Sequence, residues 1–160
     1  MGNIVLARID DRLIHGQVAV VWASHVKADM IIVVDDEVAG DPTQQMLLDL
    51  AAPQDVETLY LTVDGTLEKI SQIPSNKRVL IISRDVTILL KLVEEGLPIK
   101  EINIGNMHFK KGKRQITPTA WMDEKDIEAF KKLVSLGIKC EIRRVPSEKG
   151  REIIEFIQEV

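Results

Sequence analysis

Short apolar runs, rich in β-branched residues, alternate along this chain with segments whose apolar residues recur at helical spacing. The run Ile31-Ile32-Val33-Val34 is continuously apolar, as expected for a strand buried on both faces of a sheet. Because strands that alternate with helices form βαβ units, we predict an α/β fold with a largely parallel open sheet and helices on both faces. The predicted strands are residues 3–9, 30–34, 58–62, 78–83, 101–104 and 138–143.

Five of the predicted helices begin at a residue type that commonly caps helices. These caps are Asp41 with Pro42 behind it, Asp64, Asp85, Asp123 and Ser147. Residues 105–122 show neither pattern and form a long irregular stretch, which is often functional. The length of 160 residues fits a single domain over residues 1–160, with its active site at the carboxyl edge of the strands.

Charge and composition limit which partners this protein can bind and in which cellular compartment it is expected. The formal net charge of −4 argues against nucleic acid or an anionic membrane, since both require a basic face. No stretch reaches the roughly 18–20 apolar residues that a membrane span needs. Cys140 is the only cysteine and alternates with apolar residues, so we predict an inert core thiol. The expectation is a soluble, cytoplasmic protein.

The segment 8–17 offers the richest chemistry in the chain. His15 follows the first predicted strand and precedes a helical pattern, so it lies in a loop that feeds a helix N-terminus, a favourable place for phosphate. Gly16 permits close backbone approach, and Arg8 and Arg12 are able to contact phosphate oxygens through paired hydrogen bonds. Such a histidine acts as a nucleophile, base or metal ligand, but spacing alone favours a purely structural histidine.

Acidic residues follow the second predicted strand. Asp35 and Asp36 suit a Mg²⁺ site or a phosphorylated aspartate, as in receiver-type domains, or else a solvated turn. A receiver-like signalling module phosphorylated on Asp35 or Asp36 is therefore the alternative function. Asp85 is predicted to be a helix cap, with Arg84 at the surface or directed into the site. Phosphate-binding glycine patterns are missing after every predicted strand, which argues against a nucleotide-binding domain.

A basic loop follows the strand predicted at 101–104. Its cations are suited to an acidic partner or phosphate, or are simply solvated. His108 is a candidate second site residue, whereas His25, in the last turn of the first helix, is predicted to be structural. The candidate partner-docking residues are His108, Lys110, Lys111, Lys113 and Arg114.

Three segments together resemble a known family over essentially the whole chain. They are Arg8-Ile9-Asp10-Asp11-Arg12-Leu13-Ile14-His15-Gly16-Gln17-Val18, then Val34-Asp35-Asp36-Glu37-Val38-Ala39, then Asn103-Ile104-Gly105-Asn106-Met107-His108-Phe109. Their sequences and order are similar to those of the mannose/sorbose-type IIB subunits of bacterial sugar phosphotransferase systems. The first segment is long and specific, and it makes His15 the expected phosphoryl carrier.

The resemblance implies a mechanism without metal or cofactor. A phosphorylated IIA protein would pass its phosphoryl group to His15, expected at Nδ1, and the group would then go to a sugar held by the membrane subunits IIC and IID. Phosphate oxygens would contact Arg12, Arg8 and the helix start at Gly16 and Gln17. The residues expected to support the loop are Asp10, Asp11 and Asp36. Because two partners must reach His15, we expect residues 10–15 to be exposed.

The same resemblance bears on the substrate and on assembly. Asn106, and the Gln44-Gln45 pair, look more like the N-acetylgalactosamine branch of the family than its mannose branch. The substrate is thus a hexose or amino sugar, with N-acetylgalactosamine preferred. The protein would associate with the inner face of the cell membrane through its partner subunits, and a homodimer is left open.

Overall fold

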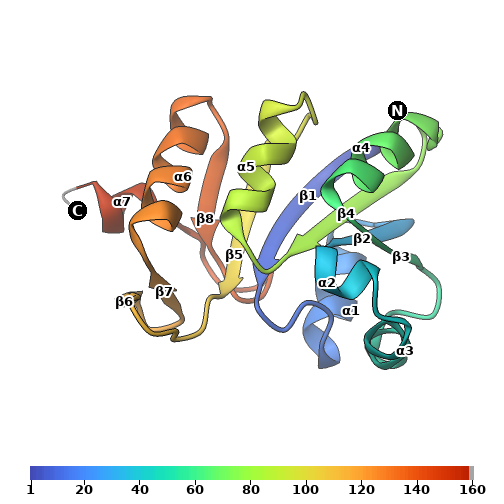
Figure 1. The fold of residues 1–160 in the computed structure, drawn as a ribbon, viewed down its shortest axis with the longest axis horizontal. Helices are drawn as coiled ribbons and strands as arrows, with labels where there is room; N and C mark the ends of the chain where they lie inside the picture. Colours follow the sequence, from blue (N-terminus) through green and yellow to red (C-terminus); the bar gives the residue numbers. More distant parts are fainter. Residues whose placement is uncertain (159–160) are drawn as a thin grey trace.

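A seven-stranded sheet with mostly parallel strands forms the centre of the molecule (Figure 1). The computed structural model describes residues 1–158. All neighbouring strands pair in parallel except the last two, which are antiparallel. In spatial order the strands are β3 (Glu57–Leu61), β2 (Met30–Val34), β4 (Arg78–Ser83), β1 (Asn3–Asp10), β5 (Glu101–Asn106), β8 (Lys139–Ile142) and β9 (Arg151–Glu152). The predicted α/β fold is confirmed.

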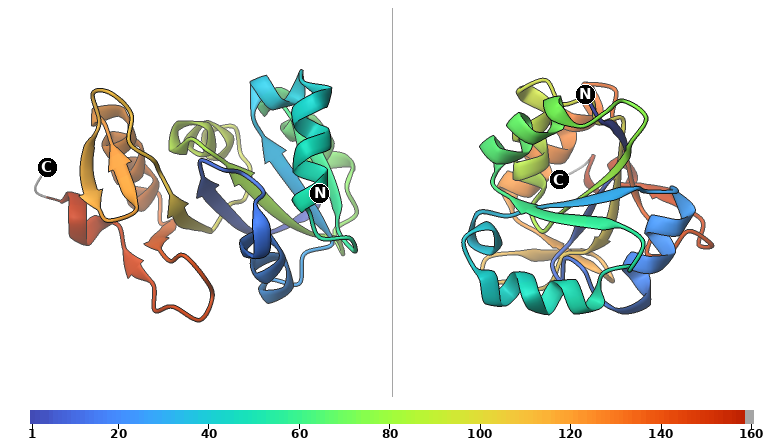
Figure 2. Two further views of the ribbon diagram at one scale, coloured as in Figure 1. Left: turned by 90° about the horizontal axis from the view of Figure 1, so that it is seen from below. Right: turned by 90° about the vertical axis from the view of Figure 1, so that its right-hand side faces the viewer.

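Helices cover both faces of this sheet, as the alternating pattern predicts (Figure 2). One face carries α1 (Gly16–His25), α2 (Asp36–Ala39) and α3 (Pro42–Ala51). The other face carries α4 (Val63–Gln72), α5 (Val86–Glu94), α6 (Glu124–Ser135) and α7 (Ile154–Ile157). None of the helices within residues 1–158 has the length and apolar character needed to cross a membrane.

Two apolar layers stabilise this arrangement, one on each face of the sheet. Along β2, Ile31 and Val33 join the layer under α1, whereas Ile32 and Val34 join the layer under α4 and α5. All four are completely buried, and burial of each such side chain contributes about 1.5–3 kcal/mol. Cys140 is buried in the second layer, so its predicted core position is confirmed, and loss of solvation raises the pKa of its thiol to about 12.

The predicted helix starts are mostly confirmed. The side chains of Asp41, Asp85 and Asp123 each accept hydrogen bonds from backbone N–H groups of the first turn of α3, α5 and α6. The prediction for α4 is wrong, because Thr62 rather than Asp64 is its N-cap. The hydroxyl of Thr62 accepts the N–H of Gly65, which starts the helix earlier and leaves Asp64 inside the first turn.

The C-terminal third differs most from prediction. Ser147 does not cap a helix, because residues 143–150 form a loop, β9 follows, and α7 begins only at Ile154. The stretch 105–122 is also more regular than predicted. It contains the hairpin of β6 (Arg114–Thr117) and β7 (Ala120–Met122), visible in orange beside α7 in the left view of Figure 2. Strands this short carry too few residues to show alternation.

Candidate active site

His15 lies where the chain leaves the central strand and enters α1. After β1 ends at Asp10, the chain turns sharply at Leu13, whose φ is 59°, and His15 becomes the N-cap of α1. Gly16 begins the helix with a φ of 46°, a region where glycine is favoured because it has no Cβ. The predicted location of His15, in a loop that feeds a helix N-terminus, is confirmed.

The buried carboxylate of Asp10 is the centre of the contacts at this site. Its Oδ2 lies 3.1 Å from Nε2 of His15 and accepts Nη2 of Arg8 at 3.3 Å. Its Oδ1 accepts the backbone N–H of Arg12 at 3.0 Å and Nε of Arg12 at 3.4 Å. Because an ionised carboxylate only accepts hydrogen bonds, this contact favours the tautomer of His15 with its proton on Nε2. That tautomer has its lone pair on Nδ1.

His15 is accessible, although much of its loop is not. The His15 side chain is 22% exposed, whereas Asp10, Leu13 and Ile14 are buried, so the expectation of an exposed 10–15 loop is wrong for those three residues. The apolar side chains of Leu13 and Ile14 fix the loop to the layer under α1. No side chain of residues 1–158 caps the first turn of α1, so its N–H groups and positive dipole end are suited to an anion.

Arg8 lies inside the molecule, 4% exposed, which differs from the expected phosphate contact. Its Nη1 donates to the side-chain oxygen of Asn103 and, at 3.2 Å, to the carbonyl of Arg143. Its Nη2 donates to the carbonyl of Arg144 at 3.2 Å as well as to Asp10. Burial lowers the pKa of the Arg8 guanidinium, and Asp10 opposes that effect. These contacts support a role in positioning Asp10 and give no support to phosphate binding.

The residues that enclose Arg8 have no role predicted from the sequence. The ring of Trp22 lies 5.2 Å below the Arg8 guanidinium, and its indole N–H donates to the carbonyl of Arg144 at 2.9 Å. A Cβ on Gly105 would collide with the Arg8 guanidinium, so only glycine lets β5 pass this close. One signal was readable: Asn103 is a polar residue between isoleucines in a buried strand, which calls for a buried partner.

Arg12 lies on the accessible side of Asp10. Its side chain is 44% exposed, and its Nε donates to Asp10, whereas its two terminal Nη groups make no hydrogen bond or ion pair within residues 1–158. Gly16 and Gln17 are also exposed at the helix start. The structure thus brings Arg12, the first turn of α1 and His15 to one accessible place.

Asp11 joins this loop to the segment after β5. Its Oδ2 accepts the backbone N–H of His108 and lies 3.3 Å from Nδ1 of His108. Its own backbone N–H donates to the carbonyl of Asn106 at 3.0 Å. The His108 side chain is 53% exposed, so it remains accessible beside the His15 loop. The expected supporting role of Asp11 therefore has a structural basis in this cross-link.

The acidic residues after β2 have structural partners. Asp35 is buried, caps α2 by accepting the N–H of Val38 at 3.0 Å, and pairs with Arg84 at 2.8 Å. Asp36 is exposed in the first turn of α2, and no contact joins it to the His15 loop among the described residues. Asp35 thus has a structural role as the cap of α2.

Some of the cations in the basic loop are paired with carboxylates and others are not. Lys113 pairs with Asp126 at 2.7 Å; burial acts to lower its pKa, but the contact with Asp126 outweighs this and raises it. Arg114 lies 3.6 Å from Glu124 in a more exposed pair. The side chains of Lys110 and Lys111 are exposed and make no hydrogen bond or ion pair with the described part of the chain. His25 is exposed in the last turn of α1 and packs edge-on against Trp22.

Comparison with known sequences gives this site its context. Residues 4–160 match the family model described as the PTS system sorbose subfamily IIB component. The chain is 37% identical over 157 residues to the N-acetylgalactosamine-specific phosphotransferase enzyme IIB component 2 of Escherichia coli K12, covering 98% of this chain and 100% of that protein. It is 40% identical over 159 residues to the mannose-specific EIIAB component of the same strain, covering 98% of this chain and 49% of that protein.

Solved structures agree in fold. The IIBSor domain of the sorbose permease from Klebsiella pneumoniae superimposes with a TM-score of 0.92 at 35% identity, covering 99% of this chain and 98% of that one. The N-acetylgalactosamine-specific IIB component 1 from Escherichia coli gives 0.89 at 36% identity, covering 94% and 99%. With a matching family model, full-length relatives and a shared fold, this chain belongs to the sorbose-subfamily IIB components of the bacterial sugar phosphotransferase system.

Proposed function

We propose that His15 is the phosphoryl-carrying residue of this IIB component and that the phosphoryl group is attached to Nδ1. The observation that carries the proposal is the contact between His15 Nε2 and the buried Asp10, which leaves Nδ1 with a lone pair beside an uncapped helix start. Arg12, whose two Nη groups make no hydrogen bond or ion pair with the described residues, supplies charge for the phosphoryl oxygens. Asp11 and Arg8 position the loop and Asp10.

The transfer steps follow from this arrangement. The lone pair of His15 Nδ1 attacks the phosphorus of a phosphohistidine on the donor protein; a new P–N bond forms as the donor's P–N bond breaks, and the donor nitrogen keeps that electron pair. Nε2–H remains on the ring, where Asp10 offsets the positive charge that develops. In the second step a sugar hydroxyl oxygen bonds to phosphorus, the bond to Nδ1 breaks, and the hydroxyl proton leaves to a base. Catalysis is mainly positioning and charge stabilisation.

The donor is a phosphorylated IIA protein, and the acceptor is a sugar bound by membrane subunits of the IIC and IID type. A fused EIIAB relative supports the pairing with IIA, because its name joins both components in one protein. The reaction takes place in the cytoplasm at the membrane surface. Relatives are named for N-acetylgalactosamine, mannose, fructose and sorbose, so the substrate is a hexose or amino sugar and the preference for N-acetylgalactosamine stays a prediction.

Transfer of label from a phosphorylated IIA protein tests this function. The parent chain should become labelled, and the label should be lost in acid, as expected for phosphohistidine. His15→Ala should accept no label, whereas His25→Ala, a matched histidine in the last turn of the same helix, should accept it at the parent rate. Labelling of His15→Ala at the parent rate would show that another residue carries the group.

A further inference from the structure

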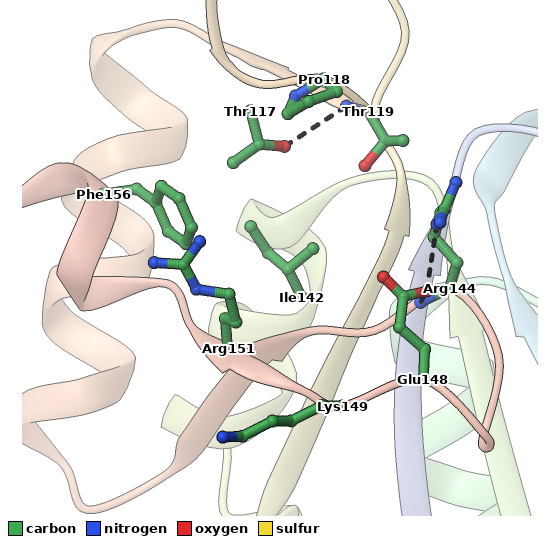
Figure 3. A pocket seen from close by; sticks show the side chains of 9 residues that line it. All are labelled: Thr117, Pro118, Thr119, Ile142, Arg144, Glu148, Lys149, Arg151 and Phe156. Carbon is green, nitrogen blue, oxygen red and sulfur yellow. Dashed lines mark hydrogen bonds and ion pairs between the residues drawn. The ribbon is translucent and has the colours of Figure 1, made fainter.

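A separate pocket lies between the β6–β7 hairpin, the loop after β8 and α7 (Figure 3). Its volume is about 260 Å³, slightly below the usual range of small-molecule sites, so its occupant must be small. Ile142 lies at its centre, the threonines of the hairpin at one side and Phe156 at another (Figure 3). The lining residues are Thr117, Pro118, Thr119, Ile142, Arg144, Glu148, Lys149, Arg151 and Phe156.

Positive charge dominates this lining, with three cations against the single carboxylate of Glu148. Nε of Arg144 donates to Glu148 at 3.0 Å, and its two Nη groups make no hydrogen bond or ion pair within residues 1–158. Arg151 lies over Phe156, with its guanidinium carbon 4.7 Å from the ring centroid, and among its nitrogens only Nη2 is paired, with Glu155 at 3.2 Å. The remaining N–H donors are suited to a phosphate or carboxylate.

The rest of the pocket is suited to a polyhydroxylated ring. Thr119 and Glu148 offer hydroxyl and carboxylate groups to hydroxyls, and the apolar atoms of Ile142 and Phe156 offer a surface to C–H groups. An anionic group, several hydroxyls and an apolar C–H face occur together in a sugar phosphate. We propose that this pocket binds a small phosphorylated monosaccharide.

One backbone carbonyl connects this pocket to the His15 site. The carbonyl of Arg144 accepts the indole N–H of Trp22 at 2.9 Å and Nη2 of Arg8 at 3.2 Å. Arg8 in turn holds Asp10, which orients His15. A ligand that moves Arg144 therefore changes the surroundings of Trp22 and Arg8. A phosphorylated sugar is also the product of the proposed reaction, so product bound in this pocket would alter the surroundings of His15. This feedback role rests on the proposed function, whereas binding of the sugar phosphate does not.

Calorimetric titration with a hexose 6-phosphate tests the pocket. We expect saturable binding with a Kd on the order of 1 mM or tighter. Arg144→Gln and Arg151→Gln should each weaken it about tenfold or more, as for loss of a charge-assisted hydrogen bond. Lys77→Gln makes the same charge change in the turn before β4, outside the pocket, and should leave the affinity unchanged. The proposal would be overturned if binding did not saturate at about 10 mM sugar phosphate. It would also be overturned if Lys77→Gln weakened binding as much as the two arginine variants do.

Titrations with two further ligands, and an NMR signal of Trp22, test the proposal in more detail. Inorganic phosphate and the unphosphorylated hexose should each bind at least roughly tenfold more weakly than the sugar phosphate, since each lacks one set of contacts. Equal affinity for inorganic phosphate would show a general anion site and contradict the sugar assignment. In NMR spectra, the indole N–H signal of Trp22 should shift on saturation, and an unmoved signal would refute the link through Arg144. None of these measurements needs a phosphoryl donor, so they remain decisive if His15 is not the carrier.

Discussion

At the scale of single residues, one buried carboxylate decides which nitrogen of His15 is available for chemistry. Asp10 is fully buried and accepts hydrogen bonds from two arginines while facing Nε2 of His15. Four donors thus converge on two oxygens, an arrangement that an amide cannot reproduce because one of its two polar atoms is itself a donor. Arg12 adds charge on the accessible side, and Arg8 holds Asp10 from the inside.

Asp10→Asn should slow phosphoryl acceptance by roughly a hundredfold or more, because the amide NH₂ opposes donors and disturbs the tautomer of His15. The rate of label transfer from phosphorylated IIA measures this, with thermal unfolding recorded alongside. A folded variant that transfers at the parent rate would remove Asp10 from the mechanism.

Arg12→Ala should slow acceptance by roughly 10²–10³-fold, as is typical when one donor to a developing charge is lost. Arg12→Lys should recover only part of that loss, because a point charge cannot replace the planar guanidinium fork. Since the Arg12 side chain is 44% exposed, both variants should unfold at nearly the parent temperature. Single-turnover kinetics that are identical for all three proteins would place Arg12 outside the site.

At the scale of elements, the site depends on where strands end. β1 and β5 pair in parallel, so Asp10 and Asn106 meet at the same edge, and Asp11 then binds His108 across the gap. The basic residues that follow do not act as one group. Lys113 is directed inward to Asp126, which leaves Lys110 and Lys111 as the cations of this loop without a partner in the described chain.

Replacing Lys110 and Lys111 by glutamine should lower the rate of transfer from phosphorylated IIA at low ionic strength if the loop guides docking. The difference from the parent should narrow as salt rises, because salt screens exposed charges. A matched control replaces Lys77 and Lys91, two exposed lysines outside this loop, and should transfer like the parent. Equal rates for both double variants at low salt would eliminate docking by this loop.

Much of this architecture could be read from the sequence, and the exceptions have physical causes. The ranges 30–34 and 78–83 were predicted without error because β2, and all of β4 between its two polar end residues, are continuous apolar runs in a buried sheet. The hairpin and β9 were missed because strands of two to four residues carry no periodicity. Within the site, Arg8 was misplaced because its partners, the carbonyls of Arg143 and Arg144, come from residues 135 and 136 positions away, and backbone carbonyls leave no signal in a sequence.

At the scale of the whole molecule, distant segments converge on His15. The β1–α1 loop supplies His15 and Arg12, β5 supplies the asparagine and glycine around Arg8, and the loop after β8 supplies carbonyls for Arg8 and Trp22. The sheet holds these segments at its carboxyl edge, the edge where ligands bind in open α/β folds. The fold therefore fixes the direction of the imidazole before any partner arrives.

Identification of the phosphorylated atom tests this account most directly. The ¹⁵N-labelled protein is phosphorylated by a phosphorylated IIA protein, and NMR then identifies the ring nitrogen that is bonded to phosphorus. The account predicts a single phosphohistidine, at Nδ1 of His15, with Nε2 still protonated beside Asp10. A phosphoryl group on Nε2 of His15, on His108, or on an aspartate would contradict it.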